Sequence, residues 1–350
     1  MEILKNTYRG TRLASLPAEI PFPSVDVAAV NRLLDLCPVK NTTTLADCPY
    51  LASDVGVASL QVKDERSRMG LGSFKALGAA YVIASLASET GAEDMTTALA
   101  GRTFITPSAG NHGLSLAAGA RAFGAKAVIY ISQTVPESFA ERLRDKGATV
   151  VREGHDYEAS MVAAMKAKDE NGWTLISDTS WDEYYETTHL LMEGYVRLAE
   201  ETVQQYDGVP THIFLQAGVG GFAGAIAAFL RDKWGDAPTI IVVEPEEAPA
   251  LIESIKVGKS IVVTGGDSHM GRLDCKEPSL VALAGLARDA DYFLTISETQ
   301  GSEHLPTLAS LDLATSGSGG AGVSALLSKP EGIGLNAESR VLCFITETES

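Results

Sequence analysis

The chain has 350 residues, enough to bury a substantial core and to form two lobes or one large α/β unit with a subdomain. Its 28 basic and 45 acidic side chains leave a formal charge of −17, which repels nucleic-acid backbones and anionic lipid surfaces. No basic stretch followed by an apolar one opens the chain, and no apolar run has bilayer-spanning length. The composition excludes a single small module and predicts a cytoplasmic protein that binds neither nucleic acid nor membrane.

The cysteines and histidines give no sign of a metal centre. The four cysteines are scattered without Cys-x-x-Cys spacing, and the six histidines form no His-x-His or His-Glu-x-x-His pattern. We therefore expect neither a catalytic metal nor a disulfide framework.

The first informative elements are a strand predicted over residues 55–63 and a helix that follows a charged turn. Apolar residues recur at helical spacing from Phe74 to Leu86, and Ser73 is the expected N-cap, which places Lys75 in the first turn. An amine at the start of a helix suits Schiff-base chemistry. Taken alone, such a lysine is more often a solvated surface residue, because catalytic lysines need a desolvated or cationic setting.

A regular alternation of strands and helices follows. Strands are predicted at residues 103–106, 127–132, 149–152 and 173–177, with helices at 113–123, 137–146 and 157–168. Four short strands separated by amphipathic helices predict a compact parallel α/β subdomain. We place this small domain at residues 89–189, inserted in a large domain formed by residues 1–88 and 190–350.

The larger domain continues with a second alternation. We predict a helix at 193–205, a strand at 211–216, a helix at 222–233, a strand at 239–243 and a last strand at 341–345. Residues 316–322 read S-G-S-G-G-A-G, which is typical of a linker. Their position between helical segments, with a strand still to come, favours a tight loop near a ligand.

The glycine-rich residues 216–224 lie after a predicted strand and before a predicted helix. Glycines there let backbone N–H groups approach an anion, and the helix dipole assists. Gly218-x-Gly220-x-x-Ala223 also fits the dinucleotide fingerprint, with Glu244 at the end of the next strand. An NAD-binding oxidoreductase is therefore the rival interpretation of this loop.

A second strand–loop–helix junction, at residues 108–113, favours the first interpretation. Its Asn111 offers an amide that can bond a phenolate oxygen, for which a dehydrogenase has no evident need. S-F-K at Lys75, S-A-G-N-H-G at residues 108–113 and A-G-V-G-G at residues 217–221 resemble the fold-type II enzymes of pyridoxal 5′-phosphate, the tryptophan synthase β-like superfamily. V-K-D-E, D-T-S-W, V-E-P and G-R-L-D-C-K-E-P further resemble the diaminopropionate ammonia-lyase branch.

The resemblance implies two parallel-sheet α/β domains with the cofactor between them, and a homodimer. Lys75 would hold pyridoxal phosphate as an internal aldimine and later take the α-proton of the substrate. Asn111 would bond the ring hydroxyl, and Thr346 would place a neutral hydroxyl beside the pyridine nitrogen. The phosphate would lie on backbone amides of Gly218, Val219, Gly220 and Gly221.

Further residues are assigned to the substrate by the same resemblance. Asp178 would lie over the substrate face and protonate the leaving group, provided that burial raises its pKa. The alternative interpretation of Asp178 is a structural one, in which an aspartate at the end of a strand caps the next turn. Thr106, Ser108 and Gly110 are candidates for the substrate carboxylate, although hydroxyls in such loops often bond backbone groups instead.

Two positions depart from the branch. The aspartate that serves it as a second base is Ala109 here, so one base remains and a single α-configuration, L, is expected to react. The glutamate of its S-G-E-S-G segment is Ser318 here, which removes a carboxylate near the cofactor.

We therefore predict a pyridoxal-phosphate-dependent ammonia-lyase. It eliminates a β-substituent from an L-amino acid, with 2,3-diaminopropionate as the first substrate, and yields a 2-oxo acid and ammonia. A dehydratase of a β-hydroxy L-amino acid such as serine, threonine, phenylserine or hydroxyaspartate is the alternative. A binding or regulatory protein that lost the reaction is a third possibility, against which the presence of Lys75 argues.

Overall fold

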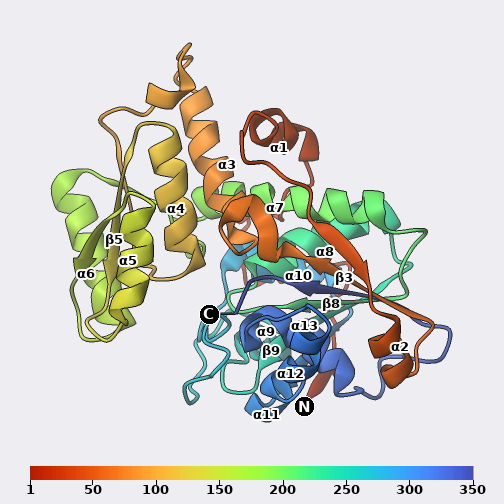
Figure 1. Cartoon of the computed structure of the whole chain (residues 1–350). Coiled ribbons are helices and arrows are strands. Elements are labelled where there is room, and N and C mark those ends of the chain that lie inside the picture. The colour runs from red at the N-terminus through yellow and green to blue at the C-terminus, as the bar shows by residue number, and fades with distance from the viewer. Residues whose placement is uncertain (350) are drawn as a thin grey trace.

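The computed structural model describes residues 1–349, and Figure 1 shows two α/β lobes, the smaller at the left. The larger lobe contains a seven-stranded sheet in the order β1-β10-β9-β8-β11-β3-β2. Its strands are β1 (Ile3–Lys5), β2 (Thr44–Asp47), β3 (Ser59–Asp64), β8 (His212–Gln216), β9 (Thr239–Pro245), β10 (Tyr292–Ile296) and β11 (Arg340–Ile345).

The five central strands of this sheet are parallel, and only the edge strands β1 and β2 run antiparallel to their neighbours. Strand β11 comes last in the chain yet lies between β8 and β3. Because the carboxyl ends of parallel strands meet at one edge, the segments that follow β3, β8 and β11 converge there. These segments carry Lys75, the glycine loop and Thr346.

The smaller lobe has a four-stranded sheet in the order β6-β5-β4-β7, and all its strands are parallel. Its strands are β4 (Thr103–Thr106), β5 (Lys126–Ile131), β6 (Thr149–Arg152) and β7 (Thr174–Leu175), and its helices are α4 (Asn111–Ala122), α5 (Glu137–Asp145) and α6 (Tyr157–Asn171). The alternation predicted from the sequence is confirmed here, and so is the α/β fold class.

Helices cover both faces of the larger sheet, as Figure 1 shows for α8 and α10 on one side and α9 and α13 on the other. The remaining helices are α1 (Val27–Leu34), α2 (Pro49–Val55), α3 (Lys75–Ser88), α7 (Glu186–Gln205), α8 (Gly221–Trp234), α9 (Ala250–Val257), α10 (Leu280–Asp289), α11 (Glu298–Ser302), α12 (Leu305–Ser310) and α13 (Gly317–Leu327), with 3₁₀ turns at Glu65–Gly70 and Met95–Thr97. None of the helices in residues 1–349 is both long and apolar enough to span a membrane.

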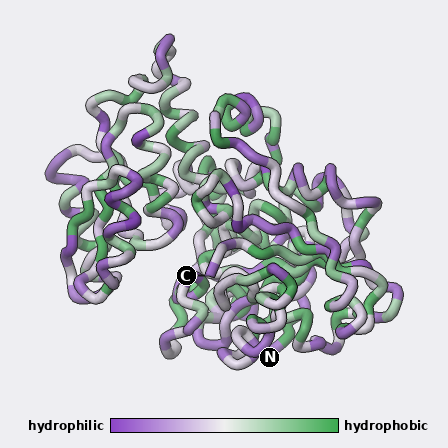
Figure 2. The backbone as a smooth tube through the Cα atoms, in the orientation of Figure 1, coloured by the Kyte–Doolittle hydropathy of each residue, from purple (hydrophilic) through white to green (hydrophobic). Residues whose placement is uncertain are grey.

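The central strands are apolar on both faces because both faces are covered. In β8, Ile213 and Leu215 face the cluster that includes α8 and α10, whereas Phe214 faces the cluster that includes α13. Figure 2 shows these strands as hydrophobic tube at the centre of the larger lobe. This buried sheet is the rigid support for the loops at its carboxyl edge.

Helices α3 and α7 pack closely against each other beside α4 of the smaller lobe. A Cβ at Gly78 would lie 2.7 Å from Tyr195, and one at Gly194 would lie 2.7 Å from the Leu77 carbonyl oxygen, so both positions need glycine. The predicted domain boundary after residue 88 falls at the end of α3, whereas the one after residue 189 falls inside α7. Both boundaries stay predictions.

The strand predicted over residues 55–63 was wrong in its first half. Residues up to Val55 belong to α2, which begins at Pro49 and ends at Gly56 in a left-handed conformation with φ 81°. Strand β3 begins only at Ser59. The alternating apolar residues around the end of α2 resemble a strand pattern. Helix α2 is instead bounded by Pro49 in its first turn and by Gly56 at its C-cap.

The loop predicted at residues 316–322 was also wrong, because this segment begins helix α13. Ser316 is its N-cap, and the Ser316 hydroxyl accepts a 2.9 Å hydrogen bond from the Gly319 N–H. A Cβ at Gly319 would lie 2.3 Å from Thr315 Oγ1, and one at Gly322 would lie 2.9 Å from Gln216 Oε1. The glycines therefore permit close packing of a buried helix, and this packing overrides their low helix propensity.

Candidate active site

Lys75 lies at the convergence of the two lobes, as the first residue of α3. Its backbone N–H donates to the Ser73 hydroxyl at 3.3 Å, and the neighbouring Phe74 N–H donates to the Thr346 carbonyl at 3.1 Å. The N-cap is Phe74 and not Ser73 as predicted, although Ser73 still satisfies one of the first N–H groups. Lys75 is thus in the first turn, as expected, and is anchored to the segment after β11.

The Lys75 ammonium forms an ion pair with Asp178, with Nζ 2.8 Å from Oδ2. Burial lowers the pKa of Lys75, but the Asp178 charge outweighs this, so the pKa is raised. Burial likewise raises the pKa of Asp178, and the charges of Lys75 and His112 reverse the direction, so this carboxyl titrates below its usual range. In this paired state Asp178 is a carboxylate and not the acid that leaving-group protonation requires.

The glycine loop between β8 and α8 is shaped for an anion. Gly220 adopts φ 95°, which favours glycine, and a Cβ at Gly218 would lie 3.0 Å from Cys275 Sγ and 3.1 Å from the Arg272 carbonyl oxygen. Throughout residues 1–349 no acceptor is found for the backbone N–H groups of Gly218 and Gly220, whereas the Val219 N–H bonds the Cys275 thiol. These donors, together with Gly221 at the start of α8, fit a phosphate group.

Asn111 and Glu347 meet from opposite lobes of the site. Asn111 begins α4, and its Nδ2 donates a 2.5 Å hydrogen bond to Glu347 Oε2. The Glu347 carboxylate also accepts from the Ser316 hydroxyl and forms an ion pair with Arg272, whose Nε lies 2.9 Å away. Burial raises the pKa of Glu347, although Arg272 opposes this effect.

Glu347 was missed by the sequence reasoning. Its backbone pairs with Ser73 in an isolated antiparallel bridge, and its carbonyl accepts a 2.6 Å hydrogen bond from the Thr315 hydroxyl. It therefore links the segment of Lys75, the start of α13 and the Asn111 amide. The only sequence signal was its position directly after Thr346, at the end of a buried strand.

Thr346 is buried in a neutral environment. Gln216 Nε2 donates to Thr346 Oγ1 at 3.3 Å and more closely to the Gly319 carbonyl at 2.7 Å. The threonine hydroxyl thus receives a hydrogen bond, and its own proton makes only a long 3.5 Å contact with the Gly319 carbonyl oxygen. A neutral hydroxyl held in this way fits the predicted partner of a pyridine nitrogen.

The residues expected to bind the substrate carboxylate lie on the loop between β4 and α4, on the same side as Asn111. Thr106 is buried at the end of β4, whereas Ser108 and Gly110 are partly exposed. A Cβ at Gly113 would lie 2.1 Å from the Ser108 carbonyl oxygen, so the loop folds tightly onto the helix. Ser108 and Gly110 are therefore the more accessible of the three.

Neither position that departs from the lyase branch supplies a carboxylate. Ala109 is partly buried and packs against the core, and Ser318 uses its hydroxyl to accept a 3.1 Å hydrogen bond from the Arg272 N–H. Arg272 itself is only partly exposed and is paired with Glu347. Asp178 and Glu347 thus remain as the acidic groups beside Lys75 that influence its pKa.

The dinucleotide alternative depends on Glu244, which the structure places in another role. Its fully buried carboxyl accepts hydrogen bonds from the Leu251 and Ile252 N–H groups at 2.7 and 2.8 Å. Burial raises the pKa of Glu244 to about 8. Glu244 therefore caps helix α9 and is not presented to a ribose.

A lysine at a helix start, a glycine loop suited to phosphate and a neutral hydroxyl after the last strand together fit a pyridoxal-type cofactor. The chain belongs to the family of pyridoxal-phosphate dependent enzymes, whose pattern matches residues 37–347. Its cofactor is accordingly pyridoxal phosphate, and the residues around the glycine loop fit that group.

Among curated proteins, the chain is 32% identical over 337 residues to the diaminopropionate ammonia-lyase of Escherichia coli strain K12, which covers 88% of this chain and 84% of the relative. The Escherichia coli enzyme in complex with D-serine has a TM-score of 0.88 at 27% identity, covering 99% of this chain and 93% of that one. Its complex with an aminoacrylate–pyridoxal-phosphate azomethine intermediate gives 0.87 at 28% identity, with the same coverage.

Proposed function

We propose that this enzyme is an ammonia-lyase that eliminates the β-substituent of an L-amino acid and releases a 2-oxo acid and ammonia. L-2,3-Diaminopropionate is the first substrate, since the relatives described above carry that activity in their names. The observation that carries the proposal is the 2.8 Å contact between Lys75 and Asp178 next to the glycine loop. This contact supports the pairing of a base with a potential acid in the proposed mechanism.

Bound pyridoxal phosphate supplies an electron sink for the substrate α-carbon. The four residues of the glycine loop would orient its phosphate through backbone N–H groups, Asn111 would hold its ring hydroxyl, and Thr346 would lie at its ring nitrogen. Because Thr346 is neutral and is already a hydrogen-bond acceptor from Gln216, it does not force a proton onto that nitrogen. A weaker electron sink suits elimination.

Lys75 then acts as the base that removes the α-proton. A lysine can do so only as a neutral amine, so the proton that its pairing with Asp178 now stabilises must pass from Lys75 Nζ to the Asp178 carboxylate, 2.8 Å away. When the positive charge leaves Lys75, the strongest cause that lowers the pKa of Asp178 disappears as well. Burial then dominates and raises this pKa, so Asp178 becomes able to protonate the departing β-amine.

The substrate carboxylate lies on the loop of Ser108 and Gly110, with Thr106 supporting the loop from the end of β4. A single base on one face limits the enzyme to one α-configuration. Ala109 cannot accept a proton, so the L-isomer is the substrate.

A second candidate is the dehydratase of a β-hydroxy L-amino acid, which runs on the same residues with hydroxide as the leaving group. The observation in its favour is that Ala109 and Ser318 present no carboxylate to a second substrate ammonium. A substrate with one ammonium and one hydroxyl needs no such carboxylate.

We infer further that the enzyme works as a homodimer in the cytoplasm. All four cysteines found among residues 1–349 are free, which is typical of a reducing compartment. Analytical ultracentrifugation of the purified protein tests the dimer.

The test of the main proposal is the absorption spectrum of the purified enzyme during addition of L-2,3-diaminopropionate. A visible cofactor band that shifts and returns while 2-oxo acid accumulates supports the proposal. Lys75→Ala should lose both the band and turnover, and Lys166→Gln, an exposed position on α6, should keep both. Turnover of L-serine or L-threonine without turnover of diaminopropionate transfers the assignment to the dehydratase. No reconstitution with the cofactor contradicts both.

A further inference from the structure

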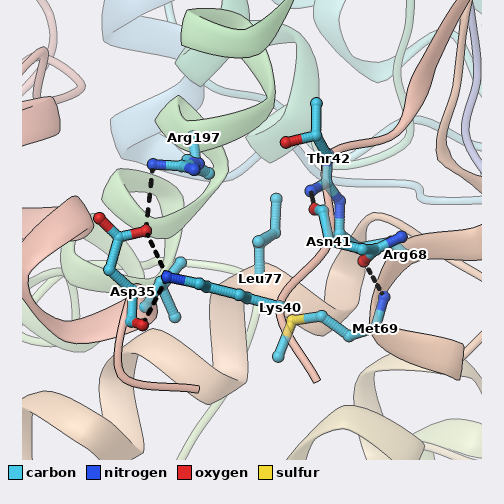
Figure 3. Close-up of a pocket in the computed structure, with 9 residues that line it drawn as sticks. Asp35, Lys40, Asn41, Thr42, Arg68, Met69, Leu77 and Arg197 are labelled. Carbon is cyan, nitrogen blue, oxygen red and sulfur yellow. Dashed lines mark hydrogen bonds and ion pairs between the residues drawn. The ribbon is translucent and has the colours of Figure 1, made fainter. Parts of the chain in front are cut away.

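A second cavity lies outside the site of Lys75, between the N-terminal segment and helices α3 and α7. It encloses about 190 Å³ and is lined by Leu34, Asp35, Lys40, Asn41, Thr42, Arg68, Met69, Leu77 and Arg197 (Figure 3). Cavities of roughly 150 Å³ already admit a ligand of benzene size. None of the lining residues belongs to the proposed active site.

One wall of this cavity carries charges of both signs whose charged groups pair with one another only at 3.5 Å or more, although Lys40 Nζ also donates a 2.7 Å hydrogen bond to the Asp35 backbone carbonyl. Lys40 Nζ lies 3.5 Å from Asp35 Oδ1, and Arg197 Nη1 lies 3.6 Å from the same oxygen (Figure 3). Tight pairs of this kind have distances of about 2.7 to 2.9 Å. The side chains of Lys40 and Asp35 are 53% and 47% exposed, so both charges are accessible to a ligand.

The third cation of the cavity is not available in the same way. Arg68 is fully buried and is paired at 2.7 Å with Glu65 and at 2.7 Å with Glu201. Arg197 donates through Nε to Glu201 at 3.3 Å and through Nη1 to Asn31 Oδ1, and Nη1 also lies 3.5 Å from Glu200. Its Nη2 bonds no atom within the described chain. The charges that face the cavity are therefore Lys40, part of Arg197, and Asp35.

This arrangement favours a ligand that carries both charges. A simple anion would meet the carboxylate of Asp35, and a simple cation would meet Lys40 and Arg197. A zwitterion satisfies both signs at once. The apolar part of the lining consists of Leu34, Met69 and Leu77.

We propose that this cavity is a binding site for a small α-amino acid with an apolar side chain. The α-carboxylate lies between Lys40 and Arg197, and the α-ammonium lies at Asp35. The side chain packs on Leu34, Met69 and Leu77.

The cavity also touches the segment that carries the active-site lysine. Met69 has φ 50° and ψ 22°, a left-handed conformation that a bulky residue rarely adopts. The Asn41 side chain holds the Met69 N–H at 2.8 Å (Figure 3). Met69 and Leu77 lie on either side of Lys75 in the chain, so an occupant contacts both ends of its segment.

Calorimetric titration of the cofactor-loaded enzyme with L-valine tests the proposal, because valine has no β-leaving group and is not consumed. The cofactor absorption spectrum, recorded in parallel, reports any valine in the active site separately. Asp35→Asn and Lys40→Gln should each weaken valine binding roughly tenfold or more, since each removes a charge-assisted contact. Lys166→Gln, also an exposed lysine, should bind valine as the wild type does.

Analogues that lack one charge complete the test. N-Acetyl-L-valine has no ammonium and L-valinamide has no carboxylate, so both should bind at least about tenfold more weakly than valine. Equal binding of either analogue, or of inorganic phosphate, would overturn the zwitterion site. So would valine binding that Asp35→Asn and Lys40→Gln leave unchanged, or no valine binding outside the active site.

Discussion

The Asn111 amide donates a 2.5 Å hydrogen bond to Glu347, a residue from the other lobe that follows the last strand. An amide carries two N–H groups and one oxygen, so a carboxylate at one N–H decides which way the whole amide points. The second N–H is then free to bond the ring hydroxyl of the cofactor. If Asn111 bonds this hydroxyl as proposed, Glu347 acts as a positioning residue through Asn111.

Glu347→Gln should weaken cofactor binding about tenfold, the effect of one lost charge-assisted hydrogen bond. The amide that replaces the carboxylate can turn its own N–H groups toward Asn111 and no longer pairs with Arg272. Equilibrium dialysis of the cofactor against the apoenzyme measures the change. Glu338→Gln, at an exposed position, is the control. Unaltered cofactor affinity in the Glu347 variant would show that Asn111 is oriented without it.

Asp178→Asn should lower kcat by roughly 10²- to 10⁴-fold, the usual contribution of a general acid, and leave KM nearly unchanged. The same variant should speed attachment of the cofactor at neutral pH. Burial lowers the pKa of Lys75 and Asp178 reverses that direction, so removing the carboxylate increases the fraction of neutral, nucleophilic amine. Stopped-flow absorbance follows the attachment.

Asp182→Asn, four residues further along at an exposed position, controls for changes in the loop. A structural cap at position 178 would give a different result. In that case kcat would fall together with the midpoint of thermal unfolding, and cofactor attachment would not become faster.

Much of the fold was predictable because it is local. Each strand and helix of the smaller lobe is a short apolar pattern bounded by its own turns, and those patterns match the structure within a few residues. Where local signals conflict with packing, the sequence is misleading. The glycines at residues 316–322 indicate a loop when taken alone. In the structure they form the start of a helix that packs closely against Thr315, Gln216 and Glu347, where larger side chains would not fit.

The site residues likewise fall into those that local motifs predict and those that depend on long-range contacts. Lys75, Asn111 and the glycine loop belong to compact motifs, each contained in one junction of the chain. Glu347 could not be found by such reasoning, because its importance arises only when β11 inserts between β8 and β3. That insertion brings the end of the chain beside residues that precede it by more than two hundred positions. No local pattern reports such a contact.

Ala109→Asp should allow turnover of D-2,3-diaminopropionate, which the wild type should not consume. A carboxylate at this position would provide a second base, which the methyl group of Ala109 cannot. Ala109→Asn is the matched control, since it has the same shape and cannot accept the proton. The measurement is 2-oxo acid formation from each isomer. Turnover of both isomers by the wild type would contradict the assignment of Lys75 as the only base.

The stability of the larger lobe should depend on pH through Glu244. Burial raises its pKa from the ordinary 4.5 to about 8, so in this interval the folded protein holds a proton that the unfolded chain releases. Folding then binds protons, and stability falls as the pH rises from about 4.5 through about 8. Glu244→Gln is neutral at every pH and keeps an oxygen for one of the two α9 N–H groups.

Urea unfolding at about pH 5 and about pH 9 measures this contribution. Between these values, the wild type should lose stability relative to Glu244→Gln by an amount on the order of a few kcal/mol. Comparing the two proteins removes the general effect of the large negative charge, because that charge is nearly the same in both. Glu338→Gln should show no such pH-dependent difference, since this side chain is exposed. A Glu244→Gln difference that is the same at both pH values would mean that the buried carboxyl is ionised throughout, held by the Leu251 and Ile252 N–H groups.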